Sequence, residues 1–310
     1  MGGWAVGLFF VLSGYWIARM WKEKYLLRQS PYRTFVISRW WRLAPLFITV
    51  QLLAVLLAFL GLPIGGREAV SDFGWWATQP LVIGATQFQR LLPPSWSLDV
   101  EMQFYLIAPL LVMGLAAVSG RDRLLTVTAL FIWGLVLVAS GVTSETPRLD
   151  LHAWLFGVGV LVSHASWKPS AKLQLGCGLG LIAGLIAMIV IPETRELVWR
   201  SGSQPGQVSP ITAYAFYIAT VLAGIPLAAG TVFRRSGQFD RWLGDLSYPL
   251  YLVHWLPREW YYSQVDWTQS PIRNGLLLLV NFLIAIGAAI VLLHLVDRPA
   301  QRLKEQVLST

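Results

Sequence analysis

Residues 275–296, with the sequence GLLLLVNFLIAIGAAIVLLHLV, contain no Lys, Arg, Asp or Glu. A helix needs about 20 predominantly apolar residues to cross the hydrocarbon core of a bilayer, so this stretch predicts a transmembrane helix. Comparable runs occur at 3–21, 43–61, 98–118, 124–142, 149–165, 173–191, 211–232 and 243–260. Together these runs predict an all-α, polytopic membrane helix bundle with about nine transmembrane helices.

The composition of the whole chain supports this class. Of the 310 residues, 55% are hydrophobic and only 13% are charged, whereas ordinary soluble domains carry roughly 25% charged residues. A soluble enzyme and a disordered chain are therefore excluded, and the single cysteine, Cys177, excludes a disulfide scaffold. The net charge of +8 does not predict nucleic-acid binding, because that needs a basic soluble face. The expected environment is a lipid bilayer.

The distribution of positive charge predicts the topology. Residues 73–89 are interrupted by Pro80 and are interpreted as an interfacial or re-entrant segment that does not cross the membrane. With nine crossings, most of the 24 lysine and arginine residues then lie on the cytoplasmic side, as the positive-inside rule requires, and the C-terminus is cytoplasmic. The connections 62–97 and 192–210 are too short for an independent core. Residues 1–310 are therefore expected to form a single transmembrane domain.

Arg39 and Arg42 form the first cluster of polar residues in this apolar chain. Their i, i+3 spacing places both guanidinium groups on one face of a helix. We expect them at the N-terminus of the second helix, where unpaired backbone N–H groups favour an anion such as a phosphate. The alternative is that they are ordinary interfacial anchors.

A second cluster contains Ser97, Glu101 and Tyr105, which recur every four residues and so line one face of a helix. A carboxylate inside a membrane is costly and is usually functional, and Glu101 could accept a proton from a hydroxyl. For Asp99 we prefer a simple electrostatic role at the helix N-terminus.

A third cluster contains Ser247, Tyr251 and His254, again on one helical face. A histidine at membrane depth can shuttle protons near neutral pH, although it can equally be a structural hydrogen-bond partner. No pair of the four histidines has metal-ligand spacing with an acid between, so no metal site is predicted.

These clusters resemble signatures of the membrane-bound acyltransferase-3 family, which includes O-antigen and other polysaccharide O-acetyltransferases. Arg39 and Arg42, followed by Pro45, match its Arg-x-x-Arg motif. The other matching segments are 8–17 (LFFVLSGYWI), 96–105 (WSLDVEMQFY), 243–254 (LGDLSYPLYLVH) and 297–299 (DRP). The five segments follow the family's order and span nearly the whole chain.

The resemblance implies an integral membrane O-acyltransferase, expected in a bacterial inner or plasma membrane. It would move an acyl group, expected to be acetyl, from cytosolic acyl-CoA to a hydroxyl of an extracytoplasmic carbohydrate or glycolipid. Acyl-CoA is then a co-substrate, and no bound cofactor is expected. The resemblance implies contacts to the CoA phosphates for Arg39 and Arg42, a catalytic role as the acid of the pocket for Glu101, and shaping of the substrate pocket for Trp96, Ser97 and Tyr105. It assigns no clear role to His254. From their shared helical face we expect His254 to be the further catalytic candidate and Ser247 and Tyr251 to line the substrate pocket.

The sequence departs from the family pattern in one respect. The family's first helix carries a basic residue, ten further residues and then the histidine usually assigned as catalytic, and none of the four histidines here has a basic residue at that spacing. The expected architecture is therefore the family's ten-helix bundle without its first helix. This leaves two alternatives open: a non-catalytic membrane protein of the same fold that binds a glycolipid or a partner, and a proton-coupled transporter.

Overall fold

The computed structural model describes residues 3–64, 67–83, 90–142, 147–190, 210–232, 235–265 and 271–309. This part of the chain consists of helices and connecting turns and contains no strand, which confirms the predicted all-α class. The principal helices are α1 (Gly3–Met20), α2 (Pro31–Phe59), α3 (Phe73–Thr78), α4 (Trp96–Ala117), α5 (Gly120–Ala139), α6 (Leu149–Ala165), α7 (Ala171–Val190), α9 (Pro210–Val232), α10 (Gln238–Val253), α11 (Trp255–Gln264), α12 (Pro271–Leu292) and α13 (Arg298–Ser309).

Five helical segments of the described residues are long and apolar enough to cross a membrane. They are Pro31–Phe59, Pro93–Ala117, Gly120–Ala139, Tyr214–Val232 and Ile272–Leu308. Two shorter apolar helices, Leu149–Ala165 and Ala171–Ala187, add to them. The protein is therefore a multi-pass membrane protein, and the number of about nine crossings stays a prediction.

The segment 73–89 contains only short helical pieces where the structure describes it. The α3 helix has six residues and is followed by a 3-10 turn, Gln79–Leu81. Six residues rise only roughly 9 Å along a helix axis, far less than the thickness of a bilayer. Residues 84–89 lie outside the described residues.

One predicted helix, 243–260, is two helices in the structure, α10 and α11, which meet at His254. Pro257 has no backbone N–H, so the carbonyl of Val253 cannot receive the usual helical hydrogen bond from it. His254 nevertheless keeps helical dihedral angles, with φ −59° and ψ −22°. The chain therefore continues in helical conformation from α10 into α11.

The contacts divide the chain into two compact units, which are described separately. The first unit comprises Met1–Pro31 and Phe104–Arg235, and the second comprises Tyr32–Gln103 and Ser236–Thr310.

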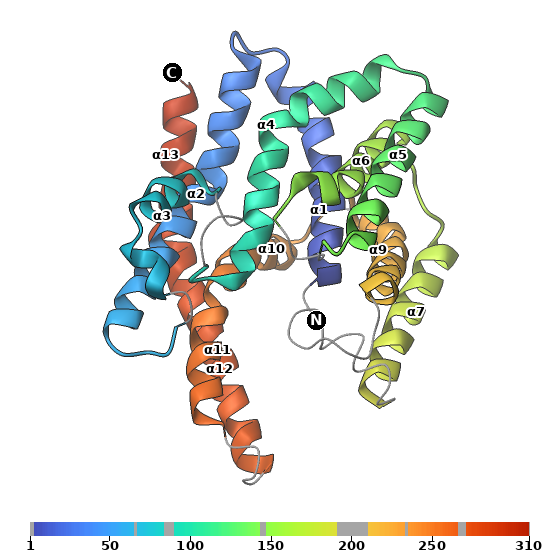
Figure 1. The fold of residues 1–310 in the computed structure, drawn as a ribbon. Coiled ribbons are helices and arrows are strands. Elements are labelled where there is room, and N and C mark those ends of the chain that lie inside the picture. Colours follow the sequence, from blue (N-terminus) through green and yellow to red (C-terminus); the bar gives the residue numbers. More distant parts are fainter. Residues whose placement is uncertain are drawn as a thin grey trace. The chain divides into compact units, whose positions relative to one another are not determined.

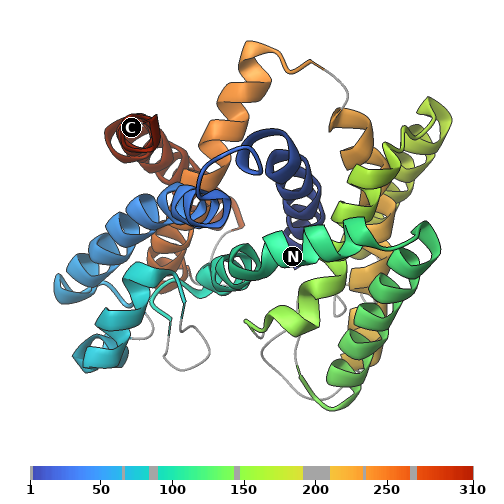
Figure 2. The ribbon, with the colours of Figure 1, turned by 90° about the horizontal axis from the view of Figure 1, so that it is seen from above.

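In the first unit, α1 packs against α6 and α9, α5 packs against α6, and α7 lies alongside α9 (Figures 1 and 2). Glycines bring α1 and α6 very close together. A Cβ atom at Gly14 would overlap the backbone of Phe156, and one at Gly159 would overlap the backbone of Val11. Small residues commonly permit such close helix packing in membranes.

In the second unit, α10 and α11 pack against α12. A short π-helix, Leu293–Asp297, joins α12 to α13, and Figure 1 shows the three as one long rod with α2 beside its α13 end. The Arg-x-x-Arg motif and the signature segments 243–254 and 297–299 belong to this unit, and the segment 96–105 begins in it.

Candidate functional site

Arg39 and Arg42 lie within α2, not at its N-terminus. The helix begins at Pro31, so Arg39 is already more than two turns inside and its backbone N–H is expected to be bonded within the helix. The expectation of a phosphate site built on unpaired N–H groups is therefore wrong. A sequence signal for the earlier start was present, because proline is favoured at the first position of a helix.

Arg42 instead joins segments that are far apart in the sequence. Its Nη1 lies 3.3 Å from Oδ2 of Asp297, and its guanidinium carbon lies 5.4 Å from the centre of the Tyr248 ring. The Tyr248 hydroxyl donates a hydrogen bond to the carbonyl of Leu43 (2.7 Å). We call Arg42, Asp297 and Tyr248 the Arg42 cluster. It brings together three of the five signature segments.

The Arg42 cluster is anchored on both sides. Trp41 Nε1 donates to the carbonyl of Ala300 (2.7 Å), and Gln301 Nε2 donates to Oδ1 of Asp297 (3.3 Å). The Asp297 side chain is 6% exposed, whereas that of Arg42 is 33% exposed. The carboxylate therefore depends on Arg42 for its charge balance more than Arg42 depends on the carboxylate, since the guanidinium still reaches solvent.

A second contact joins the start of α4 to α10. Ser97 and Tyr251 have hydroxyl oxygens 2.7 Å apart, and the Tyr251 hydroxyl also lies 2.7 Å from the carbonyl of Pro94. A carbonyl can only accept, and both hydroxyls are within donating distance of that of Pro94, Tyr251 at 2.7 Å and Ser97 at 3.3 Å. In the contact between the two hydroxyls either oxygen can be the donor. Two residues that the sequence assigned to the substrate pocket are thereby in direct contact.

The remaining α4 candidates are buried in the same helix. Trp96, Glu101 and Tyr105 are 7%, 2% and 4% exposed. Asp99 is also buried and accepts a hydrogen bond from Gln103 Nε2 (2.7 Å), so it does more than complement the helix N-terminus.

A cavity of about 550 Å³ lies among α10, α11 and α12 of the second unit. It is lined by Ser247, Leu250, Tyr251, His254, Arg258, Tyr261, Tyr262, Leu278, Asn281, Phe282 and Ala285. The structure thus brings the whole predicted stripe, Ser247, Tyr251 and His254, to one cavity. Glu101 is not among the residues that line it.

His254 has its protonation pattern set by its own helix. Its Nδ1 atom lies 2.8 Å from the carbonyl of Tyr251 and 3.1 Å from that of Leu250. Because a carbonyl oxygen only accepts, Nδ1 must carry the proton. In the neutral imidazole Nε2 is then the nitrogen that can accept a proton.

Two further polar residues of the cavity were not singled out from the sequence. Arg258 follows His254 by four residues, so it extends the stripe of Ser247, Tyr251 and His254 along the same face. Extending the predicted stripe by four residues beyond His254 would have identified Arg258 from the sequence. Asn281 comes from α12, and its signal is a single amide within a long apolar run, which is the kind of residue that membranes exclude unless it has a role.

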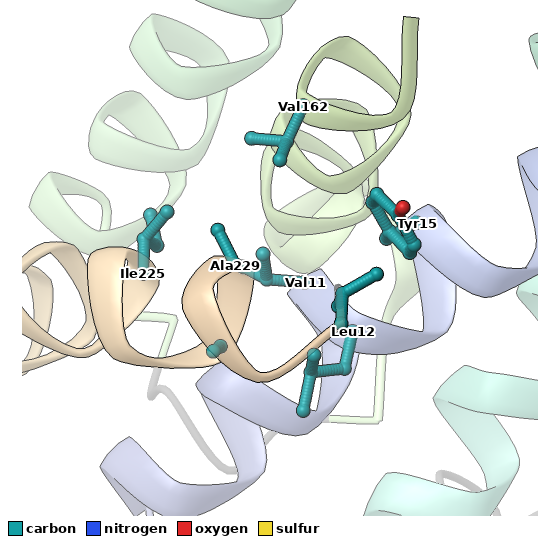
Figure 3. Close-up of a pocket in the computed structure, with 8 residues that line it drawn as sticks. Val11, Leu12, Tyr15, Val162, Ile225 and Ala229 are labelled. Carbon is teal, nitrogen blue, oxygen red and sulfur yellow. The ribbon is translucent and has the colours of Figure 1, made fainter. Parts of the chain in front are cut away.

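One pocket of the first unit, among α1, α6 and α9, is very small (Figure 3). Val11, Leu12 and Tyr15 of α1 face Val162 of α6 and Ile225 and Ala229 of α9 around a volume of about 10 Å³. That is about the size of one water molecule, and the lining is almost entirely apolar. It cannot hold an acyl donor or a sugar.

Comparison with known proteins places the chain in a family. The acyltransferase-3 family model, described as an acyltransferase domain, matches residues 1–295. The chain is 24% identical to a regulator of hypoxia-inducible factor 1 from Caenorhabditis elegans, over 99% of this chain and 70% of the relative. It is 26% identical to the acyltransferase MdmB from Streptomyces mycarofaciens, over 98% of this chain and 82% of that protein. It is also 25% identical to the peptidoglycan O-acetyltransferase OatA from Listeria monocytogenes, over 81% of this chain and 44% of that protein. No solved structure matches the chain. Because the family model covers nearly the whole sequence, the chain belongs to the acyltransferase-3 family and is an acyltransferase.

Proposed function

We propose that the protein transfers an acyl group, expected to be acetyl, from cytosolic acyl-CoA to a hydroxyl of an extracytoplasmic carbohydrate or glycolipid. It would act in a bacterial plasma membrane with its C-terminus in the cytoplasm. The observation that carries the proposal is His254 at the cavity. Its Nδ1–H is held by a backbone carbonyl, which leaves Nε2 as a base.

The reaction needs a group that accepts a proton. His254 Nε2 would remove the proton from the acceptor hydroxyl while its oxygen attacks the thioester carbonyl. A carbon–oxygen bond forms, the carbon–sulfur bond breaks, and the proton passes from the imidazolium to the CoA sulfur. The products are the O-acylated acceptor and free CoA, and the histidine returns to its neutral form.

Ser247 and Tyr251 would shape the pocket beside this base. Tyr251 reaches from α10 to the start of α4, where Ser97 bonds its hydroxyl. Trp96, Glu101 and Tyr105 belong to the same buried helix, and Glu101 remains the proposed acid of the site. Through Tyr251 the α4 signature would support the cavity that contains the base.

Arg39 and Arg42 would bind the CoA phosphates with their side chains alone. Forked guanidinium groups suit phosphate oxygens. In the described residues, both hydrogen bonds from Arg42 to Asp297 come from Nη1. One third of the Arg42 side chain is exposed. A phosphate can therefore approach Arg42 without separating it from Asp297.

The experiment measures transfer of radiolabelled acetyl from acetyl-CoA to the carbohydrate and lipid fractions of membrane vesicles that contain the full chain. The test variant is His254→Asn, because the Asn amide can still donate to the Tyr251 carbonyl but offers no base. The matched control is His164→Asn, since His164 Nδ1 bonds its own helix at the carbonyl of Val160 (2.9 Å) and His164 does not line the cavity.

We expect His254→Asn to lose roughly 10²- to 10⁴-fold in rate, the usual contribution of a general base, while His164→Asn keeps its rate. Equal rates in the two variants would refute the role of His254. Movement of labelled substrate across the vesicle membrane without acyl transfer would favour the transporter alternative. Binding of acetyl-CoA without any transfer would favour the non-catalytic alternative.

A further inference from the structure

The side chain of Arg258 is held by two aromatic rings at the edge of the cavity. Its guanidinium carbon lies 3.9 Å from the centre of the Trp255 ring and 4.6 Å from that of Tyr262. These residues are three before and four after Arg258, so one face of α11 supplies both rings. Stacking on aromatic faces orients a planar guanidinium and reduces its freedom before a ligand arrives.

The guanidinium retains hydrogen-bonding capacity. Its one described hydrogen bond runs from Nη1 to Oε1 of the adjacent Glu259 (3.2 Å). An arginine has five N–H donors, so most of its capacity is available to a ligand. The Arg258 side chain is 38% exposed and lines the cavity, whereas Glu259 does not.

The charge of the cavity has one sign. Among the described residues that line it, Arg258 is the permanent cation and none is a carboxylate. A charge in a segment predicted to cross the membrane is costly and is retained where it has a role. The cavity is therefore suited to an anionic group.

Asn281 adds a hydrogen-bond donor from the other wall. Its Nδ2 is buried and has no hydrogen-bond partner among the described residues. A buried donor without a partner is unfavourable, and a hydrogen bond to a ligand oxygen would remove that cost. Tyr261 and Tyr262 also line the cavity and combine an apolar ring with a hydroxyl, which suits a sugar ring.

We propose that the acceptor is an anionic carbohydrate whose carboxylate or phosphate is bound by Arg258, with Asn281 as a further donor. This inference rests on the proposed function. Four residues of helix rise roughly 6 Å, so Arg258 lies about one turn from His254. That separation fits a charged group and a reacting hydroxyl on the same sugar or on adjacent sugars.

The first test measures binding to the full chain in nanodiscs, without acyl-CoA, by titration calorimetry. The probes are methyl glucuronide, glucose 6-phosphate and the neutral methyl glucoside, of which the first and third differ only at one carbon. We expect at least one anionic probe to bind tenfold or more tightly than the glucoside. The better of the two identifies carboxylate or phosphate as the preferred group, and equal binding of all three would overturn the proposal.

The variants test whether Arg258 causes the preference. Arg258→Gln should abolish the preference for the anionic probe while binding of the glucoside stays within twofold. Glu259→Gln should enlarge the preference, because it removes the carboxylate that competes for the guanidinium. Arg258→Lys, which keeps the charge, should retain a reduced preference and serves as the second variant should Arg258→Gln not fold. A preference that survives Arg258→Gln, or is unaffected by both other variants, would refute the assignment.

The outcome is separable from that of the proposed function. Binding is measured without a donor. If the wild-type protein transfers no acetyl group, the proposed reaction is refuted while a measured charge preference still stands. If wild-type protein acetylates its acceptor and shows no charge preference, the proposed function stands and the anionic subsite is refuted.

Discussion

The ion pair between Arg42 and Asp297 gives an asymmetric prediction for stability. Replacing Arg42 by Gln keeps much of the side-chain stem and removes the charge. It leaves the carboxylate of Asp297, whose side chain is 6% exposed, with the hydrogen bond from Gln301 at 3.3 Å. An unpaired buried charge typically costs about 3–5 kcal/mol, and the remaining hydrogen bond reduces this. We therefore expect Arg42→Gln to lower the free energy of unfolding by about 2–3 kcal/mol.

The opposite variant should be milder. Asp297→Asn leaves a guanidinium that is 33% exposed and stays near the Tyr248 ring. A long side chain of this kind can keep its charge in water, and pairs with an exposed partner contribute about 0–1 kcal/mol. We expect a loss of about 1 kcal/mol, and a double variant that loses less than the sum of the two single variants.

The assay is SDS-induced unfolding in mixed micelles, followed by the fluorescence of the 16 tryptophans. Arg302→Gln, on an exposed part of α13, is the control for loss of one positive charge and should change stability by less than about 0.5 kcal/mol. If Asp297→Asn is as costly as Arg42→Gln, or if the two effects add, the unequal burial of the pair does not determine its energetics.

Two further perturbations probe the packing of the helices and the contact at α10. Gly159→Leu should lower stability by about 3 kcal/mol or prevent folding, because its side chain would meet the backbone of Val11. In the control Gly176→Leu, a Cβ atom has nothing within 4 Å to meet. Fluorescence-detected size-exclusion chromatography would compare the two variants, and similar monodisperse yields would refute the close contact of α1 and α6. Tyr251→Phe should cost about 1 kcal/mol through loss of the hydrogen bond to Pro94. Tyr262 is 44% exposed, so Tyr262→Phe should be nearly neutral in the SDS unfolding assay. Equal stabilities for the two tyrosine variants would contradict the bonding described for Tyr251.

Local sequence was sufficient to predict the helices because each apolar run satisfies its own backbone hydrogen bonds in a bilayer. The class, the membrane environment and the family signatures all follow from short stretches such as 275–296 and 96–105. The errors occurred at helix ends. The start of α2 at Pro31 and the division at His254 depend on single prolines, whose effect hydropathy does not register.

The sequence by itself determined the all-helical membrane class and which polar residues share a helical face, since both follow from composition and from a period of 3.6 residues. The activity did not follow from these patterns; it came from the resemblance of five short segments to the acyltransferase-3 family. Tertiary structure decided which faces meet. It paired Arg42 with Asp297, joined Ser97 to Tyr251, and placed Asn281 of α12 across a cavity from His254 and Arg258. These partners are separated by up to 255 residues, and no local periodicity specifies contacts over such distances, because they arise only when the helices pack.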